Sequence, residues 1–147
     1  MKISVMNLGI KKWTKTTKKQ RAAYIEAITV NKDFISTIYF SHYENTLSYV
    51  DLTILTTAKA ILDKAKHPYE AHVYIDGLRK SEQHQFTAGL RKLHVRLKMA
   101  RGLNDQADEF IRLADAIAGF VRDSLEGQEV MKELYKTLQK KGILTKI

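Results

Sequence analysis

The sequence contains no cysteine and only one proline among its 147 residues. Without cysteine, disulfides, thiolate zinc sites and thiol nucleophiles are all excluded. The five histidines show neither an HExxH motif nor another paired-ligand spacing. Zinc chemistry is therefore not expected.

Long apolar runs are also missing, because no run approaches the roughly 20 residues that span a bilayer. The N-terminus shows no signal-peptide pattern, and no Ser/Gly-rich tract marks an internal linker. We therefore expect a cytoplasmic protein with no membrane partner and one domain over residues 1–147. Its expected parts are a basic segment over 1–30, a core over 31–125 and an amphipathic C-terminal helix over 127–142.

The charge is strongly positive, with a formal net charge of +9, and no acidic residue precedes Glu26. Such an excess favours a polyanionic partner, most often nucleic acid, although basic residues can equally serve only to solvate a helix. The candidate phosphate-binding residues fall in two clusters, and they include Lys11, Lys12, Lys15, Lys18, Lys19, Arg79 and Lys80.

The apolar pattern alternates between two periods along the chain. Helical spacing predicts helices over about 16–30, 49–65 with Ser48 as N-cap, 81–90 and 105–125, and a final helix before Gly142. Apolar, β-branched and aromatic runs predict strands over 34–40, 71–77 and 93–99, and residues 1–6 are a weaker strand candidate. This alternation favours an α/β sheet with helices packed on it.

Asp115 interrupts a mostly apolar stretch from Phe110 to Phe120. At about 100° per residue, Asp108 and Asp115 lie on the shoulder of an expected buried stripe. Two stacked carboxylates suit Mg²⁺ or Mn²⁺. The alternative is that Asp108 matches the helix dipole in the first turn and that Asp115 bonds to Arg112 or to a loop. The expected stripe consists of Phe110, Ala114, Ile117, Ala118, Val121 and Leu125.

Asp76 ends the predicted strand over 71–77, and Gly77 follows it. Open α/β sheets place functional groups at the carboxyl ends of their strands. A loop or N-cap role for Asp76 is equally compatible with the pattern.

Two segments, Val73-Tyr74-Ile75-Asp76 and Ile111 to Gly119, resemble the bacterial and phage family known as domain of unknown function 3800. The resemblance covers about residues 30 to 125 and implies a ribonuclease-H-like mixed sheet flanked by helices. It implies an Mg²⁺- or Mn²⁺-dependent nuclease in which Asp76 and Asp115 are catalytic. In that reading Asp76, Asp108 and Asp115 bind the metal, Asp105 lies near a further polar position, and Lys80, Arg112 or Arg122 holds the phosphate.

The chain departs from that family at its first strand, which in the family carries an acidic motif absent here. The expectation is therefore a fold lacking part of its N-terminal strands, with an extra C-terminal helix and an incomplete metal cluster. Two alternatives stay open. One is a non-catalytic nucleic-acid-binding domain in which tyrosines or Trp13 stack on bases. The other is an interaction domain that forms a homodimer or binds a partner protein.

Overall fold

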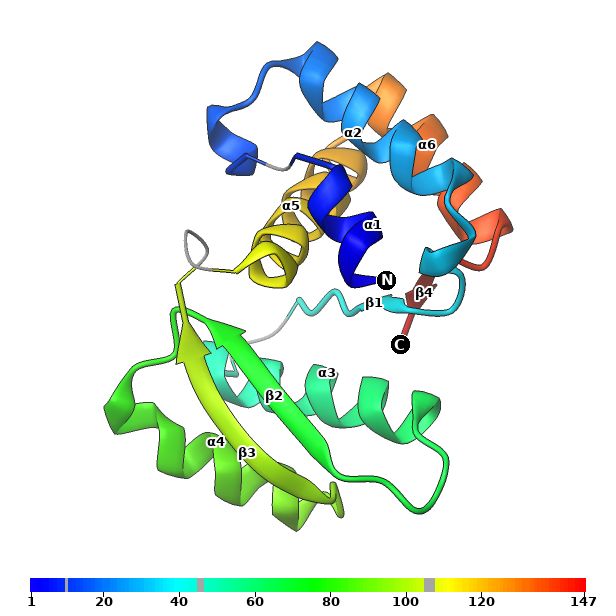
Figure 1. Ribbon diagram of the computed structural model, residues 1–147. Helices are drawn as coiled ribbons and strands as arrows, with labels where there is room; N and C mark the ends of the chain where they lie inside the picture. The colour runs from blue at the N-terminus through cyan, green and yellow to red at the C-terminus, as the bar shows by residue number, and fades with distance from the viewer. Residues whose placement is uncertain (10, 45–46, 105–107) are drawn as a thin grey trace. The chain divides into compact units, whose positions relative to one another are not determined.

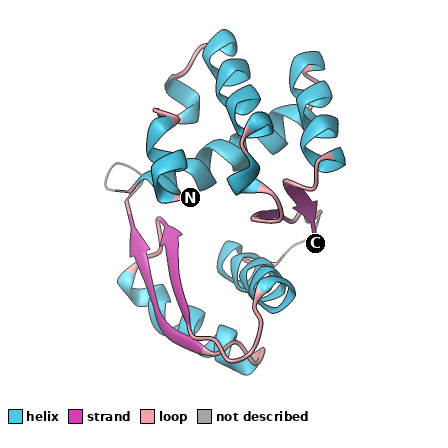
Figure 2. Cartoon of the chain, turned by 45° about the vertical axis from the view of Figure 1, so that its right-hand side comes forward, coloured by secondary structure: helices cyan, strands magenta, loops and turns pink. Residues whose placement is uncertain are grey.

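The computed structural model describes residues 1–9, 11–44, 47–104 and 108–147. The chain divides into two compact units, the first made of Met1–Ile38 and Asp105–Thr145, the second of Tyr39–Asn104 and Lys146–Ile147. Six α-helices and two separate two-stranded sheets occur among the described residues (Figure 1, Figure 2). The α/β class is confirmed, and the described strands form no larger mixed sheet. The assignment of the chain to a single domain stays a prediction.

The first unit is built mainly of helices. Helix α5 packs against α6, α1 and the short 3-10 helix η1, and α2 packs against α6 and η2. The long helix α5 therefore lies at the centre of this unit's packing. The elements are α1 (Lys2–Asn7), η1 (Trp13–Lys15), α2 (Lys18–Val30), η2 (Lys32–Phe34), α5 (Glu109–Leu125) and α6 (Glu129–Lys140).

Two short strands, β1 (Ile38–Phe40) and β4 (Leu144–Lys146), pair with each other. The Ile38 amide donates to the Ile143 carbonyl at 3.3 Å, and the Ile147 amide donates to the Phe40 carbonyl at 3.0 Å. Both strands therefore run in the same direction. Two of the three boundaries between the units along the chain, after Ile38 and after Thr145, fall within these strands.

The second unit is a parallel strand pair covered by two helices. Its elements are α3 (Tyr49–Lys64), β2 (Ala71–Asp76), α4 (Lys80–Lys92) and β3 (Leu97–Leu103). Strands β2 and β3 are parallel neighbours, so α4 is the crossover that parallel pairing requires. Both helices lie on one face of the sheet (Figure 1). The core on that face contains Val50, Ile54, Ala58, Val73, Ile75, Phe86, Leu90, Val95 and Ala100.

The other face of the β2–β3 sheet is open to solvent. Val73 and Ile75 are buried, and His72, Tyr74 and Asp76 alternate with them as exposed residues. Ala71 lies opposite Leu97 but His72 lies opposite Met99, so Lys98 is an extra residue in β3. This bulge sets which β3 side chains share a face with those of β2. The open sheet face, as named below, consists of His72, Tyr74, Asp76, Met99, Arg101 and Leu103.

Several elements begin where local sequence signals predicted. Ser48 caps α3, because its side chain accepts a hydrogen bond from the Asp51 amide at 3.2 Å. Thr17 caps α2: its hydroxyl oxygen accepts from the Gln20 amide at 3.2 Å, and the Thr17 amide donates in return to Gln20 Oε1 at 2.9 Å. The predicted helices over 49–65 and 16–30 and the strand over 71–77 are confirmed to within two residues at either end.

Three predicted strands differ from the structure. Residues 1–6 are mostly the helix α1, and only the last three residues of the expected strand over 34–40 are extended as β1. The strand expected over 93–99 begins only at Leu97. The reason is that His94 has a φ of 67° and the Val95 amide bonds back to the Leu90 carbonyl at 3.1 Å. The chain is therefore still closing the end of α4 at these positions.

The buried face of α5 also differs from the expected stripe. Phe110 and Leu125 are 40% and 50% exposed, and Ala114 and Ala118 are exposed as well. Ile117 and Val121 are buried as expected. The buried face is wider and turned, because α5 packs against several elements rather than one. It includes Ile111, Leu113, Ala116, Gly119, Phe120, Asp123 and Ser124. None of the described helices combines the length and apolar character needed to cross a bilayer.

Candidate nucleic-acid interface

The three acids predicted to hold a metal lie in different units. Asp76 ends β2 in the second unit and is exposed. Asp108 and Asp115 belong to the first unit, at the start and in the middle of α5. The described residues contain no group of three or more His, Asp or Glu placed to hold a metal ion. The Mg²⁺ or Mn²⁺ site and the nuclease activity therefore stay predictions.

Asp108 has a local structural role. Its Oδ1 accepts hydrogen bonds from the amides of Phe110 at 2.8 Å and Ile111 at 3.1 Å, so it is the N-cap of α5. The position of Asp108 at the start of α5 is the one assumed in the alternative interpretation, in which its negative charge matches the helix dipole. Asp115 is half-buried within α5. Asp105, the other acid considered near the metal, lies outside the described residues.

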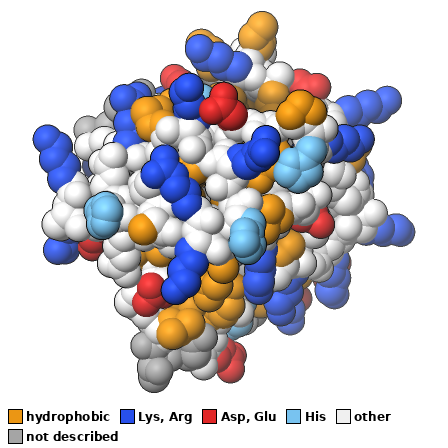
Figure 3. Space-filling model, turned by 90° about the horizontal axis from the view of Figure 1, so that it is seen from below, with side chains coloured by type: hydrophobic (Ala, Val, Ile, Leu, Met, Phe, Trp, Pro, Cys, Tyr) orange, Lys and Arg blue, Asp and Glu red, His pale blue; other side chains and the backbone are white. Residues whose placement is uncertain are grey.

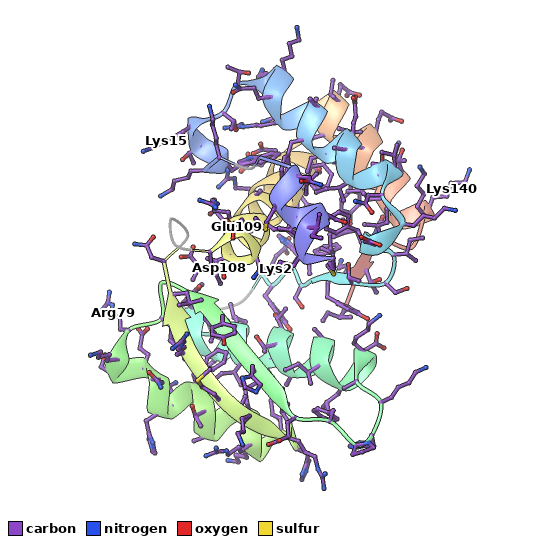
Figure 4. The ribbon with its side chains drawn as sticks, in the orientation of Figure 1. Lys2, Lys15, Arg79, Asp108, Glu109 and Lys140 are labelled. Carbon is purple, nitrogen blue, oxygen red and sulfur yellow. The ribbon has the colours of Figure 1, made fainter. Side chains whose placement is uncertain are left out.

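The predicted basic residues are mostly exposed. Figure 4 shows Lys15 and Arg79 pointing away from their ribbons. Arg112 differs, because its side chain is only 26% exposed and forms an ion pair with Glu109 at 3.2 Å. Arg122 contacts Asp123 at 3.5 Å. We call the exposed first-unit group the lysine segment: Lys11 and Lys12 before η1, Lys15 within it, and Lys18 and Lys19 in the first turn of α2.

The open sheet face carries a flat pair of side chains at its centre. Tyr74 of β2 is 41% exposed and lies directly opposite Arg101 of β3. The Arg101 guanidinium carbon is 5.3 Å from the centroid of the Tyr74 ring, a distance at which a cation and an aromatic ring attract each other. Exposed His72 and half-buried Met99 are the next pair along the strands. The face therefore combines aromatic, cationic and polarisable groups.

The loop after β2 is held close to β3. A Cβ atom built on Gly102 would lie 2.3 Å from the Leu78 carbonyl oxygen, so only glycine allows this approach. The same loop leads to Arg79, whose backbone amide donates a hydrogen bond to Glu82 Oε2 at 3.1 Å. Arg79 and Lys80, both exposed, are thus fixed just beyond the carboxyl end of β2.

The second unit is basic and holds all five histidines. Among residues 39–104 and 146–147, eleven Lys and Arg stand against six Asp and Glu, which gives a formal charge of +5. Figure 3 shows Lys and Arg side chains spread over one face of the molecule, with His side chains among them. A surface of this kind attracts polyanions at moderate salt concentration.

Comparison of the chain with family models, curated proteins and solved structures finds no match. The resemblance to the family known as domain of unknown function 3800 therefore stays a prediction.

Sequence reasoning missed the most buried acid of the described residues, Asp123, whose side chain is 5% exposed. Its Oδ2 accepts hydrogen bonds from Trp13 Nε1 at 2.9 Å and from Arg21 Nη1 at 3.3 Å. The Arg21 guanidinium also donates to the Trp13 carbonyl from Nη2 at 2.9 Å and from Nε at 3.1 Å. We call Trp13, Arg21 and Asp123 the buried clamp.

A sequence signal for the buried clamp does exist. Gly119 lies one helical turn before Asp123, and a Cβ at Gly119 would lie 2.3 Å from Trp13 Cδ1. A glycine and an acid that share one face of a helix indicate that a large polar partner packs there. The chain contains only one tryptophan, so the candidate partner was available from the sequence.

Proposed function

We propose that this protein binds single-stranded nucleic acid on the open sheet face of its second unit. The observation that carries the proposal is the exposed Tyr74–Arg101 pair, with its 5.3 Å separation. Nucleic-acid bases stack on aromatic rings and on guanidinium planes, whatever their sequence. Two such groups side by side offer a platform for stacked bases.

The charge of the second unit supports a polyanion over a neutral ligand. Its formal charge of +5 supplies the electrostatic attraction on which phosphate-backbone binding depends. Arg79 and Lys80 follow the strand that carries Tyr74 and offer exposed phosphate contacts. In the first unit the lysine segment offers a further surface for the phosphate backbone of the nucleic acid. The contribution of this segment to binding depends on its charge alone.

A single strand fits this face better than a duplex. Stacking on Tyr74 needs a base whose flat face is uncovered, and a duplex covers these faces with its neighbouring base pairs. The six residues of β2 extend for about 20 Å at roughly 3.3 Å per residue. This length accommodates a few nucleotides.

The test is the affinity for a fluorescently labelled 12-nucleotide single strand, measured by anisotropy at several salt concentrations. We expect Tyr74→Ala to weaken binding about five- to 100-fold, the loss associated with one stacked base. Phe110→Ala is the matched control, because Phe110 is 40% exposed and lies on α5, among the residues of the first unit. Equal losses in the two variants, or none in either, would refute a stacking role for the open sheet face.

Two further arms separate binding from cleavage and stacking from charge. A duplex of the same sequence should bind more weakly than the single strand. The oligonucleotide should remain intact with Mn²⁺ present; cleavage that is lost in Asp76→Asn and in Asp115→Ala would support the nuclease hypothesis instead. Replacing the five residues of the lysine segment by serine should lower the dependence of affinity on salt while leaving the effect of Tyr74→Ala unchanged.

A further inference from the structure

Of the residues that define the open sheet face, only Asp76 is acidic. The other members of the face are aromatic, cationic, polarisable or apolar, and the second unit as a whole is basic. A carboxylate repels the phosphates of a nucleic acid, so it does not contribute to the attraction on which backbone binding depends. A carboxylate on this face therefore suits contact with the edge of a base, where sequence is read.

The strand sets the position of Asp76 relative to Tyr74. Both residues are exposed and they flank the buried Ile75, so their side chains leave the same face of the sheet. At roughly 3.3 Å per residue, their Cα atoms lie about 7 Å apart along the strand. A purine is long enough to cover this separation. A base stacked at Tyr74 can therefore direct one edge toward the Asp76 carboxylate.

Contacts on several sides hold the backbone of Asp76 in place. Asp76 belongs to the paired part of β2, and the Tyr49 hydroxyl donates to its carbonyl at 3.5 Å. The chain turns directly after it, because Gly77 has a φ of 70° and the Leu78 carbonyl lies against Gly102. The carboxylate thus projects from a backbone that is already ordered, so a ligand need not order it on binding.

The chemistry of a carboxylate indicates which base it selects. An ionised carboxylate only accepts hydrogen bonds, and its two oxygens are best matched by two donors side by side. Guanine presents such a pair on its Watson–Crick edge, in N1–H and the 2-amino group. Adenine and cytosine place a ring-nitrogen acceptor beside their amino group, and uracil and thymine flank N3–H with two carbonyl oxygens. These acceptors repel the second carboxylate oxygen, so guanine is the best partner among the unpaired bases.

We propose that Asp76 gives the open sheet face a preference for guanine, by accepting hydrogen bonds from N1–H and the 2-amino group of a base stacked at Tyr74. This inference rests on the proposed binding of single strands to the same face, and it adds the base that the face selects. The guanine must be unpaired, because a duplex engages the same edge in base pairing.

A set of labelled 12-nucleotide strands tests the preference from the ligand side. Each strand is thymidine with guanosine, inosine, adenosine or cytidine at every third position, and anisotropy is measured in lithium buffer, in which guanine quadruplexes are unstable. We expect the guanosine strand to bind about 5- to 150-fold more tightly than the adenosine and cytidine strands, the discrimination of one good bidentate contact. Inosine lacks only the 2-amino group, so the affinity of its strand should lie between these limits.

Asp76→Asn tests the preference from the protein side with little change in shape. An amide offers one donor and one acceptor, so the variant should bind the guanosine strand about 5- to 150-fold more weakly. Its affinity for the adenosine strand should not fall, because a charge that repels phosphate is removed. Glu70→Gln is the matched control, because Glu70 is exposed, precedes β2 at its other end and pairs with Lys98 at 3.9 Å. It removes the same charge from the second unit and should keep the full preference.

The outcomes separate this inference from the proposed function, and circular dichroism verifies that each variant is folded. Equal affinity for all the strands, or a preference for guanosine that persists in Asp76→Asn, would overturn the role of Asp76 even where Tyr74→Ala weakens the binding of every strand. A preference lost equally in Asp76→Asn and Glu70→Gln would reflect charge alone and would also overturn it. Absence of binding to any strand, or binding that Tyr74→Ala leaves unchanged, would refute the proposed function and this inference with it.

Discussion

The first unit buries a carboxylate among its helices, whereas the described charged residues of the second unit all remain partly or fully exposed. Asp123 and Ser124 are the buried polar residues of the described chain, and both lie on α5. In the second unit the core is apolar, and the polar side chains collect on the open sheet face and on the outer sides of the helices. A polar group that is buried must have its partners supplied by the fold, while an exposed one remains available for a ligand. This difference favours a stabilising role for the buried clamp and leaves the open sheet face as the proposed binding surface.

Among the substitutions that test this difference between the units, removal of the buried Asp123 carboxylate should lower the free energy of unfolding most. Asp123→Ala leaves the Arg21 guanidinium and the Trp13 ring nitrogen without their shared acceptor. We expect a loss of about 3 kcal/mol or more in the free energy of unfolding, as when one partner of a buried charged pair is removed. Urea unfolding followed by Trp13 fluorescence reports the first unit, which contains the only tryptophan.

The control for that variant lies on the same helix. Asp115→Ala removes a half-buried carboxylate from α5 and should change the free energy of unfolding by no more than about 0.5 kcal/mol. If the two variants are equally stable, the buried clamp does not stabilise the first unit, and the contrast between the units is wrong.

Replacing one helical glycine by alanine in each unit should change the free energy of unfolding by a smaller amount. Gly119→Ala places a Cβ 2.3 Å from Trp13 Cδ1, on a ring fixed by Asp123, and should cost about 2 kcal/mol. Gly89→Ala in α4 meets the flexible end of Ile54 at 2.8 Å. There the gain in helix propensity, about 1 kcal/mol, offsets the small displacement of Ile54, so its stability should hardly change. Thermal unfolding of the two variants measures the difference. A greater loss of stability in Gly89→Ala than in Gly119→Ala would show that the Trp13 ring is not held rigidly.

The smallest expected effect concerns the helix caps, which are alike in both units. Thr17→Ala and Ser48→Ala each remove a side chain that accepts a backbone hydrogen bond at 3.2 Å. Each should cost about 1 kcal/mol in the free energy of unfolding. Unequal costs, measured by urea unfolding followed by circular dichroism, would show that the units differ in local helix stability as well as in the placement of charge.

The structural features that are predicted best are those that depend on residues adjacent in the sequence. The helix beginning after Ser48 and the strand ending at Asp76 follow from a cap and from a short apolar run, and both are confirmed. The strand expected over 93–99 was misplaced because alternating apolar residues there close a helix end, which depends on the left-handed backbone of His94. Local patterns do not distinguish these two cases.

The candidate sites depend on partners that are distant in the sequence. Arg21 and Asp123 are 102 residues apart, so Asp123 reads locally as an ordinary acid beside Arg122. Likewise, Tyr74 lies within the strand predicted over 71–77, but its pairing with Arg101 depends on the bulge at Lys98. The basic charge was visible in the composition, but the Tyr74–Arg101 pair only in the strand register.

The first unit is made from two stretches of chain, and the second unit lies almost entirely between them in the sequence. A ribosome adding about 5–20 residues per second must therefore complete the strands and helices of the second unit before it reaches Asp123. Trp13 precedes Asp123 by 110 residues, which corresponds to a delay of about 5–20 seconds. During translation, therefore, the second unit can fold first, although its chain begins after that of the first unit. Trp13 and Arg21 gain their buried partner only when Asp123 has been synthesised.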